Sequence, residues 1–218
     1  MTPLPLFQLH DVHFAYEAAR PVLKGADFML HAGEKVALCG ANGAGKTTLF
    51  HLMVGLVLPS QGKLSAFGAE CRREADFHAV RARTGLLFQD SDDQLFCPTV
   101  VEDVAFGPLN QGCSRPQARA LATEALDLVG LSGFEDRVTH KLSGGQKRLV
   151  ALATILAMKP QVLLLDEPTN GLDRDARTRL LRVLDGLPQT LMVISHDDDA
   201  LSALTRRRVT LENGLLSG

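Results

Sequence analysis

The sequence of 218 residues predicts an α/β domain with an antiparallel β layer near its N-terminus and an inserted α-helical subdomain. Residues 162–166 and 191–195 form unbroken apolar runs, which are expected of strands in a parallel sheet buried on both faces. Residues 36–39 form a similar run that leads through a glycine-rich turn into a stretch with helical periodicity. Strands that alternate with helices in this way are typical of an α/β core.

The chain contains no internal repeat and no low-complexity linker, so we predict a single domain over residues 1–218. Within it, residues 1–90 and 159–218 are expected to form the core together with the β layer. From about residue 91 to residue 158 the pattern changes to helical spacing, which indicates the inserted subdomain.

The expected antiparallel layer begins near the N-terminus. Apolar and polar residues alternate from Phe7 to Tyr16, with a slip of one residue that indicates a β-bulge. Residues 26–31 alternate again, before a turn that leads into the strand of residues 36–39. A turn precedes another short strand at residues 63–67, and residues 84–89 form one more short apolar strand.

The later elements follow from helical spacing of apolar residues and from capping residues. Ser114 stands two residues before a proline and is expected to be the N-cap of a helix. A final strand and turn are expected at residues 206–214. The predicted helices span residues 116–129, 144–158 and 173–187.

Composition and charge limit the possible functions. Hydrophobic residues make up 45% of the chain and charged residues 22%, as in ordinary globular proteins. The formal net charge of −2 provides no basic field, so nucleic acid is disfavoured as the main partner. No stretch approaches about eighteen consecutive apolar residues and no secretory pattern opens the chain, so a cytoplasmic protein is expected. The four cysteines lie far apart and are interpreted as reduced thiols.

The glycine-rich turn carries a phosphate-binding pattern. Gly40 and Gly45 are followed by Lys46 and Thr47, between an apolar strand and a helical stretch. Such a turn presents backbone N–H groups and a helix N-terminus to a polyphosphate, with the lysine reaching the β- and γ-phosphates and the threonine ligating Mg²⁺. An ordinary glycine turn before a helix is the alternative. The helical stripe after the turn consists of Leu49, Leu52, Met53 and Leu56.

Two acids end the apolar run of residues 162–166. In a nucleotide site, Asp166 could hold Mg²⁺ through water, and Glu167 could orient or deprotonate the water that attacks the γ-phosphate. Acids also end buried strands at the solvent edge for purely structural reasons. The presence of the glycine turn in the same chain favours the functional interpretation.

A second glycine-containing helix start lies at residues 142–146, which read LSGGQ. Ser143, Gly144 and Gly145 open the helix predicted at residues 144–158, so their backbone could approach a phosphate closely. A capped turn would explain the serine, but not both glycines together with Gln146. One nucleotide does not need two such helix ends from the same subunit.

The order of these motifs resembles the ATP-binding subunit of an ABC transporter over essentially the whole chain. The resemblance implies a P-loop NTPase (RecA-like) core, with ATP and Mg²⁺ as cofactors. It implies Glu167 as the general base and His196 and Gln89 as further catalytic residues, with Thr47, Gln89 and Asp166 around the metal. The implied nucleotide contacts are Tyr16, Asn42, Gly43, Ala44, Gly45, Lys46, Thr47, Thr48, Ser143, Gly144, Gly145 and Gln146.

Two of these roles have structural alternatives. Tyr16 would stack on adenine by the resemblance, but it could also be an ordinary aromatic residue of an edge strand. Asp173 would belong to a loop that communicates between two sites, or it could simply cap a helix.

The resemblance also accounts for the second helix start. Similar proteins dimerise head to tail, so that residues 143–146 of one subunit close on the ATP held by residues 40–48 of the other. A second ATPase subunit is therefore the expected partner, either an identical chain or a paired relative.

A narrower resemblance lies in residues 87–111, which read LFQDSDDQLFCPTVVEDVAFGPLNQ, and in LSGGQKR at residues 142–148. These stretches look like the energy-coupling-factor (ECF) transporters, particularly the group for cobalt and nickel uptake. The resemblance implies an importer subunit at the cytoplasmic face of the cell membrane, with integral membrane subunits that contact the region from about Gln89 to Phe106. A vitamin importer, for example for biotin, is the alternative. A soluble ABC ATPase acting on nucleic acid or ribosomes, or a nucleotide switch without hydrolysis, is a more distant one.

Two departures from the ECF pattern affect these expectations. Asp90 and Ser91 follow Gln89 where the group more often has Asn and Pro. Many ECF ATPases also continue beyond the position of Gly218 into a segment that strengthens the dimer. We therefore expect a weak or ATP-dependent dimer, or one that forms only on the membrane partner.

Overall fold

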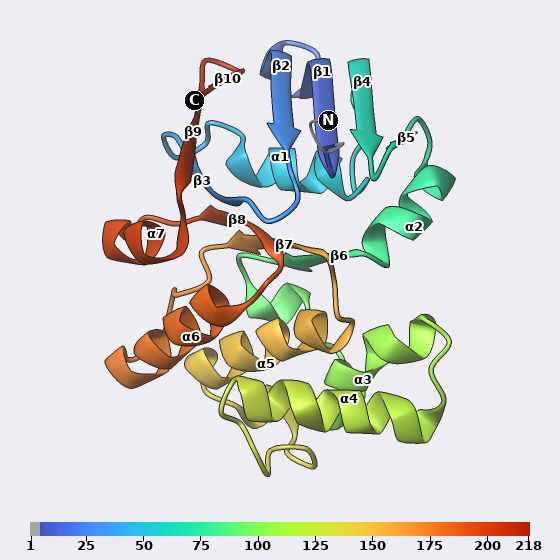
Figure 1. Cartoon of the computed structure of the whole chain (residues 1–218), viewed down its shortest axis with the longest axis vertical. Helices are drawn as coiled ribbons and strands as arrows, with labels where there is room; N and C mark the ends of the chain where they lie inside the picture. The colour runs from blue at the N-terminus through green and yellow to red at the C-terminus, as the bar shows by residue number, and fades with distance from the viewer. Residues whose placement is uncertain (1–4) are drawn as a thin grey trace.

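A computed structural model describes residues 5–218, so the first four residues of the predicted 1–218 domain lie outside the described part. The described chain forms stacked layers (Figure 1). An antiparallel sheet lies at one end, followed by helix α1 (Lys46–Met53), a second sheet and a group of helices. The mixed α/β architecture predicted from the sequence is confirmed.

The antiparallel sheet contains the predicted β-bulge. Leu9 pairs with Phe28 and Val12 pairs with Ala26, so β1 holds one extra residue, and Asp11 adopts a φ of 49° there. The second strand extends further toward the N-terminus than the predicted residues 26–31. The prediction was too short because a second irregularity at Gly25 breaks the alternation of apolar and polar residues. The strand order is β2 (Arg20–Leu30), β1 (Phe7–Glu17), β4 (Gln61–Ala66) and β5 (Ala69–Glu70).

The second sheet is parallel except for its last strand and is buried on both faces, as predicted. In its interior strand β7, Leu163 and Leu165 face the apolar cluster of the helices, whereas Val162 and Leu164 face the cluster around α1. The order is β10 (Leu215–Ser217), β9 (Arg207–Glu212), β3 (Lys35–Cys39), β8 (Thr190–Ile194), β7 (Val162–Asp166) and β6 (Thr84–Leu87), with β10 antiparallel to β9.

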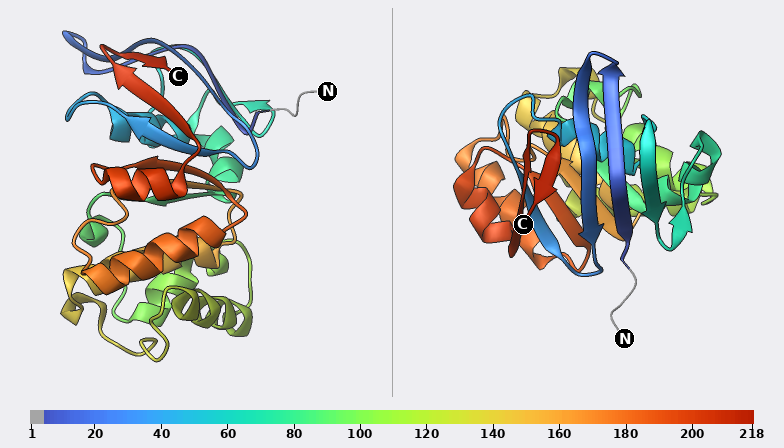
Figure 2. Two further views of the ribbon diagram at one scale, coloured as in Figure 1. Left: turned by 60° about the vertical axis from the view of Figure 1, so that its left-hand side comes forward. Right: turned by 90° about the horizontal axis from the view of Figure 1, so that it is seen from above.

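The helices predicted from apolar spacing are present with small shifts in their ends. Ser114 caps α4 (Arg115–Leu128) as predicted, in a reciprocal arrangement with Gln117. Helices α3 (Val100–Asn110), α4 and α5 (Gly144–Ala157) pack against one another and share an apolar cluster with the sheet. The boundaries of a separate helical subdomain at about residues 91–158 stay a prediction. Helix α6 (Arg174–Gly186) lies beside α5 (Figure 2).

One part of the predicted helical stripe is wrong. Helix α1 ends at Met53, and Leu56 lies beyond it with 50% of its surface exposed, because Gly55 turns the chain with a φ of 70°. Short elements were not predicted, since fewer than two helical turns show no clear periodicity. They are α2 (His78–Arg81), α7 (Asp198–Leu204), the short strands β5 and β10, and the 3₁₀ turns η1 (Glu74–Phe77), η2 (Ser91–Asp93) and η3 (Thr139–Lys141).

Among residues 5–218, no helix combines the length and the apolar character that crossing a bilayer requires.

Candidate active site

The residues singled out in the sequence meet at one edge of the parallel sheet. Gly40 follows β3, Gln89 follows β6, Asp166 and Glu167 stand at the end of β7, and His196 follows β8. Because these strands are parallel, their carboxyl ends lie side by side, which is where ligands bind in open α/β sheets. They surround a cleft of about 580 Å³ lined by Tyr16, Val22, Asn42, Gly43, Gly45, Lys46, Thr47, Thr48, Gln89, Asp166, Glu167, Ile194 and His196.

The cleft gathers most of the predicted nucleotide contacts, with three differences. Val22 and Ile194 line it although the sequence pattern did not single them out. Ala44 lines a neighbouring hollow instead, against the apolar cluster around α1. Among the described residues that line the cleft, none belongs to residues 143–146.

The glycine turn is held in a shape that only glycine permits. Gly40 has a φ of 146°, and a Cβ there would lie 2.5 Å from the carbonyl oxygen of Leu211 in β9. Gly45 has a φ of 105°, and a Cβ there would collide with Cγ1 of Val22. Gly45 is the N-cap of α1 and supplies no side-chain acceptor, so the first N–H groups of that helix are left for an anion.

Lys46 points back across the same turn. Its Nζ donates to the carbonyl oxygens of Gly40 at 2.8 Å and Ala41 at 3.0 Å. An ammonium group has three N–H donors, so one remains available. The turn therefore wraps around a positive charge, which is the geometry expected of a phosphate cradle.

Thr47 and Asp166 bring two oxygen atoms together as the sequence predicts for a magnesium site. The Thr47 hydroxyl donates to Oδ2 of Asp166 at 2.6 Å. Asp166 is only 3% exposed, and its burial raises the pKa of its carboxyl above the ordinary value, while the hydrogen bond from Thr47 opposes that shift.

These two oxygens fit the way Mg²⁺ is bound beside nucleotides. Within residues 5–218 there is no group of three or more His, Cys, Asp or Glu side chains that could hold a metal ion. Mg²⁺ typically takes one or two protein oxygens and completes its shell with phosphate oxygens and water. Thr47 and Asp166 therefore suit a metal that arrives with the nucleotide.

The carboxylate of Glu167 is held by two residues that follow β8. Its Oε2 lies 3.3 Å from both the Ser195 hydroxyl and the His196 backbone N–H, which donate to it. Its Oε1 is buried and has no hydrogen-bond donor, with Nε2 of His196 at 3.6 Å. Oε1 is therefore a buried acceptor whose hydrogen-bonding capacity is not used within the described chain.

Tyr16 stands at the exposed side of the cleft. Its side chain is 62% exposed, and its hydroxyl lies 3.4 Å from Oγ1 of Thr48. The ring meets Phe14 edge-on, with 4.8 Å between the ring centroids. β1 lies between β2 and β4 in the sheet, so the alternative of an edge strand is wrong, although the pairing with β4 stops at His13. An exposed aromatic residue near the end of β1 suits either an adenine platform or an ordinary surface position.

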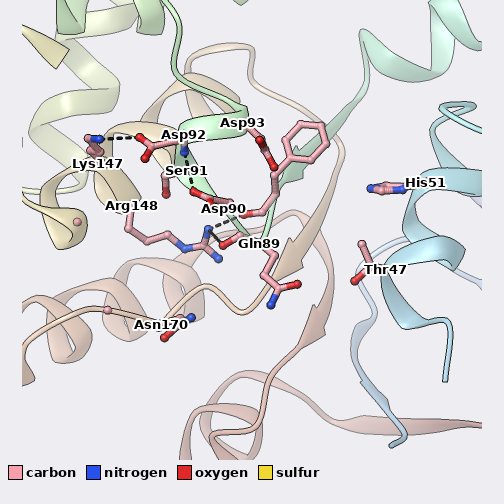
Figure 3. Close-up of a pocket in the computed structure, with 13 residues that line it drawn as sticks. Thr47, His51, Gln89, Asp90, Ser91, Asp92, Asp93, Lys147, Arg148 and Asn170 are labelled. Carbon is pink, nitrogen blue, oxygen red and sulfur yellow. Dashed lines mark hydrogen bonds and ion pairs between the residues drawn. The ribbon is translucent and has the colours of Figure 1, made fainter. Parts of the chain in front are cut away.

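Gln89 separates the nucleotide cleft from a second hollow of about 630 Å³. Figure 3 shows the side chains of this second hollow, where Thr47 and His51 of α1 lie opposite the segment of residues 89–93. Thr47 and Gln89 line both spaces. Burial lowers the pKa of His51 below its ordinary value, against the raising effect of Asp166.

Residues 143–146 lie apart from the cleft at the start of α5. Ser143 is the N-cap, and its hydroxyl accepts from the backbone N–H of Gln146 at 3.2 Å. The Gln146 side chain in turn accepts from the backbone N–H of Ser143 at 3.0 Å. Gly144 is exposed and lines the second hollow. A single chain therefore keeps this segment outside its own nucleotide cleft.

Two further residues have clear positions in the structure. The resemblance gave a role to the first, Asp173, and gave none to the second, Arg148. Asp173 accepts from the backbone N–H of Ala176 at 2.8 Å, so it caps α6 as the structural alternative expected. Arg148, which the sequence pattern did not single out, is buried between α5 and the ends of β6 and β7. Its position directly after the LSGGQK stretch, on the apolar face of a helix, was the one available signal.

A model of the ABC transporter family matches residues 23–170, which is more than half of the chain. The chain belongs to the ABC transporter family. Its motifs, its fold and its site therefore describe an ATP-binding subunit of this family, an ATPase coupled to transmembrane transport. The resemblance predicted from the sequence is confirmed.

Curated relatives extend over almost the whole chain. A putative ABC transporter ATP-binding protein of Nitratidesulfovibrio vulgaris is 50% identical over 213 residues, which cover 97% of this chain and 78% of the relative. An energy-coupling factor transporter ATP-binding protein, EcfA, of Methanothermobacter thermautotrophicus is 41% identical over 215 residues, covering 97% of this chain and 69% of the relative.

Solved structures share the fold. The structure of cbiO1 from Clostridium perfringens, part of the ABC transporter complex cbiONQ, has a TM-score of 0.85 and 32% identity and covers 98% of this chain and 87% of its own. The ATP-binding cassette MJ0796, in a dimeric post-hydrolysis state with ADP and Pi, has a TM-score of 0.89 and 25% identity, with 97% of each chain covered.

Proposed function

We propose that the chain is the ATP-hydrolysing subunit of an ECF-type importer that drives uptake of a transition metal ion, cobalt or nickel. The observation that carries the proposal is the combined similarity to EcfA at 41% identity and to cbiO1 of the cbiONQ complex at 32% identity. The ECF-like stretch of residues 87–111 supports the same group. An importer for a vitamin such as biotin is the alternative, because membrane subunits select the solute.

The proposed chemistry follows from the geometry of the cleft. Lys46 and the free N–H groups at the start of α1 would bind the β- and γ-phosphates of ATP. Thr47 and Asp166 would hold Mg²⁺, with Gln89 beside them, and the bound ion would offset the charge of the phosphates. Glu167 would accept a proton from the attacking water through Oε1, which has no hydrogen-bond donor within the described chain, and His196 would contact the γ-phosphate.

A second ATPase subunit would complete the site. The exposed start of α5 offers a second set of backbone N–H groups that its own cleft does not use. In the proposed dimer, residues 143–146 of one subunit lie over the nucleotide of the other, and the similarity to a dimeric cassette with ADP and Pi supports this arrangement. ATP would bridge both surfaces, whereas ADP lacks the γ-phosphate that holds them together. The second subunit is an identical chain or a paired relative.

The membrane partner would contact an apolar groove next to the predicted region from Gln89 to Phe106. Phe96 and Phe106 are 66% and 44% exposed, and their rings meet edge-on with centroids 4.9 Å apart. Beside them lies a groove of about 230 Å³ whose apolar residues come from the end of α1, from β6 and from α3 and α5, namely Val54, Leu56, Leu86, Phe88, Ile155 and Met158. A short amphipathic helix of an integral membrane subunit would fit such a groove, and the chain would then be a peripheral protein at the cytoplasmic face of the membrane.

Co-purification followed by uptake tests the proposal. The tagged chain is expressed with its neighbouring membrane subunits, and uptake of labelled Co²⁺, Ni²⁺ and biotin is compared in cells carrying the complex. Integral membrane proteins should co-purify, and Co²⁺ or Ni²⁺ uptake should require the parent chain and stop with Glu167→Gln. Uptake of biotin alone would mean that the transported solute is a vitamin and not a metal ion. Enrichment of RNA or DNA without membrane proteins would contradict the transport role.

A further inference from the structure

Arg148 makes an unusual set of contacts for a buried cation. Its side chain is 3% exposed, and all of its hydrogen bonds go to backbone carbonyl oxygens. Figure 3 shows Arg148 beside Gln89. Two of these oxygens belong to the segment after β6 and three to the segment after β7. Nη1 donates to Phe88 at 2.5 Å and Gln89 at 3.2 Å, Nη2 to Asp166 and to Glu167 at 2.6 Å, and Nε to Pro168 at 3.4 Å.

The guanidinium is therefore used as a planar set of donors. It has five N–H groups, which match the five carbonyl oxygens around it. Burial lowers the pKa of Arg148 to about 10, so the group still carries its charge at neutral pH. Burying a charge is costly unless every donor is satisfied, and the five carbonyl oxygens around Arg148 meet that condition.

The carbonyls that Arg148 holds belong to the two segments that carry the proposed catalytic side chains. Leu87 pairs with Leu165 in the sheet, so the residues after them leave neighbouring strands side by side. Glu167 has a φ of 50°, which is unfavourable for a residue with a side chain. Arg148 donates to the carbonyls of Asp166, Glu167 and Pro168, and so fixes the backbone on both sides of this strained residue.

Arg148 also lies on the helix that begins with Ser143. Two other side chains join α5 to residues 88–94: Lys147 pairs with Asp92 at 2.6 Å, and Gln94 donates to the carbonyl of Ala151 at 2.9 Å. Those links reach the segment after β6 but not β7. Arg148 alone in this set reaches both strands.

We propose that Arg148 is a positioning residue. It fixes the backbone of Glu167 and Gln89 relative to each other and to the start of α5. Arg148 does not itself line the nucleotide cleft, and it acts through the backbone of Gln89, Asp166 and Glu167, which do. Contact of a partner's nucleotide with residues 143–146 is passed through α5 and Arg148 to Glu167. The proposal rests on the roles proposed above for Glu167 and Gln89.

The test is Arg148→Lys in the full chain with its membrane subunits. Lysine keeps the charge, but its three tetrahedral donors cannot satisfy five carbonyls arranged around a plane. The kcat for ATP, expressed per nucleotide-binding chain, should fall at least about tenfold, with the KM for ATP within about threefold of the parent, because misplacement of a reacting group by about 1 Å costs up to about a hundredfold. Arg179→Lys is the matched control, since Arg179 is exposed and donates to one carbonyl, that of Gly130.

Expressing kcat per nucleotide-binding chain removes the effect of any unfolded fraction. A kcat that falls less than about threefold, or a KM that rises in proportion to the loss, would overturn the proposal. Arg148→Ala gives a second measurement, in which guanidinium at low millimolar concentration should restore part of kcat and methylammonium should not. Equal responses to both cations would also overturn it. A Glu167→Gln chain that hydrolyses ATP at the parent rate would instead refute the proposed base.

Discussion

Two helix starts in this chain share glycines and an exposed backbone, yet they are built differently. Helix α1 begins after Gly45, without a side-chain cap, among the residues that line the nucleotide cleft. Helix α5 begins after Ser143, with a reciprocal cap to Gln146, outside that cleft. The first start leaves its N–H groups for a ligand held by its own chain. The second start is capped by its own side chains and lies where another molecule can approach it.

The glycines of the two starts differ in what requires them. A Cβ on Gly40 or Gly45 would collide with atoms of the same chain, so the fold of the loop itself needs glycine there. A Cβ on Gly144 would meet nothing within 4 Å. The chain's own packing therefore gives no reason for glycine at Gly144, and we infer that the reason lies in a partner that comes close to it.

The largest expected effect separates ATP binding from ATP hydrolysis within the first region. Glu167→Gln removes the proposed base while keeping the size of the side chain, so kcat should fall by about a hundredfold to ten-thousandfold. ATP binding should persist, and the dimer should become long-lived because ATP is not consumed. Phosphate release and size-exclusion chromatography with ATP measure the two outcomes. Hydrolysis at the parent rate would show that Glu167 is not the base.

Gly144→Ala tests the second region by itself. The added methyl enters open space in the single chain, so melting temperature and ATP binding should stay unchanged. It would lie between the helix start and a partner's phosphate, so ATP-dependent dimerisation should weaken and hydrolysis should fall by about tenfold to a hundredfold.

Gly186→Ala is the matched control for Gly144→Ala, because a Cβ at Gly186 also meets nothing within 4 Å and Gly186 ends α6. It should leave hydrolysis at the parent level. Parent-level hydrolysis in Gly144→Ala as well would mean that no partner approaches this helix start closely.

Variants of Tyr16 test whether the nucleotide cleft at the start of α1 extends as far as the adenine base. Tyr16→Ala should raise the KM for ATP about tenfold, since stacking of an aromatic side chain on a base contributes about 1–3 kcal/mol. Tyr16→Phe keeps the ring and loses only the contact with Thr48, so its KM should stay near the parent value. Steady-state kinetics with ATP decide between the two roles. Equal KM values in both variants would make Tyr16 an ordinary exposed residue of β1.

The parts of the structure that local patterns specify were predictable from the sequence. Residues 162–165 and 191–194 are apolar at every position because both faces of the sheet are covered, and the slip between Leu9 and Val12 marked the bulge. The glycine turn and the two acids were predictable for a related reason. Their chemistry depends on neighbours in sequence, and the parallel sheet brings the strand ends together.

The parts that depend on distant contacts were not predictable. Arg148 is buried because carbonyl oxygens up to 60 residues away in sequence receive its donors, and its place on the apolar face of α5 does not identify those partners. Leu56 continues the helical spacing, but Gly55 ends the helix before it. The burial of Asp166 likewise depends on the layers packed around it and not on the residues next to it in sequence.

The burial of Asp166 leads to the smallest expected effect, a gain in stability. Because the pKa of its carboxyl is raised in the folded chain, the folded state binds the proton more tightly than the unfolded state. The free energy of unfolding therefore falls as the pH rises through this range and stays lower above it. Asp166→Asn cannot ionise, so without nucleotide and Mg²⁺ it should melt at a higher temperature than the parent at pH 8, and this advantage should shrink toward the ordinary carboxyl pKa of 3.8.

Calorimetry at several pH values measures this difference, with Asp136→Asn as a control at an exposed carboxyl. The control should show no gain at pH 8. A lower melting temperature for Asp166→Asn would mean that the hydrogen bond from Thr47 to the carboxylate outweighs the cost of burial. A gain in stability with loss of ATP hydrolysis would mark Asp166 as a residue that destabilises the empty cleft and is retained for its ligand, in contrast to the self-capped start of α5, which carries no such buried charge.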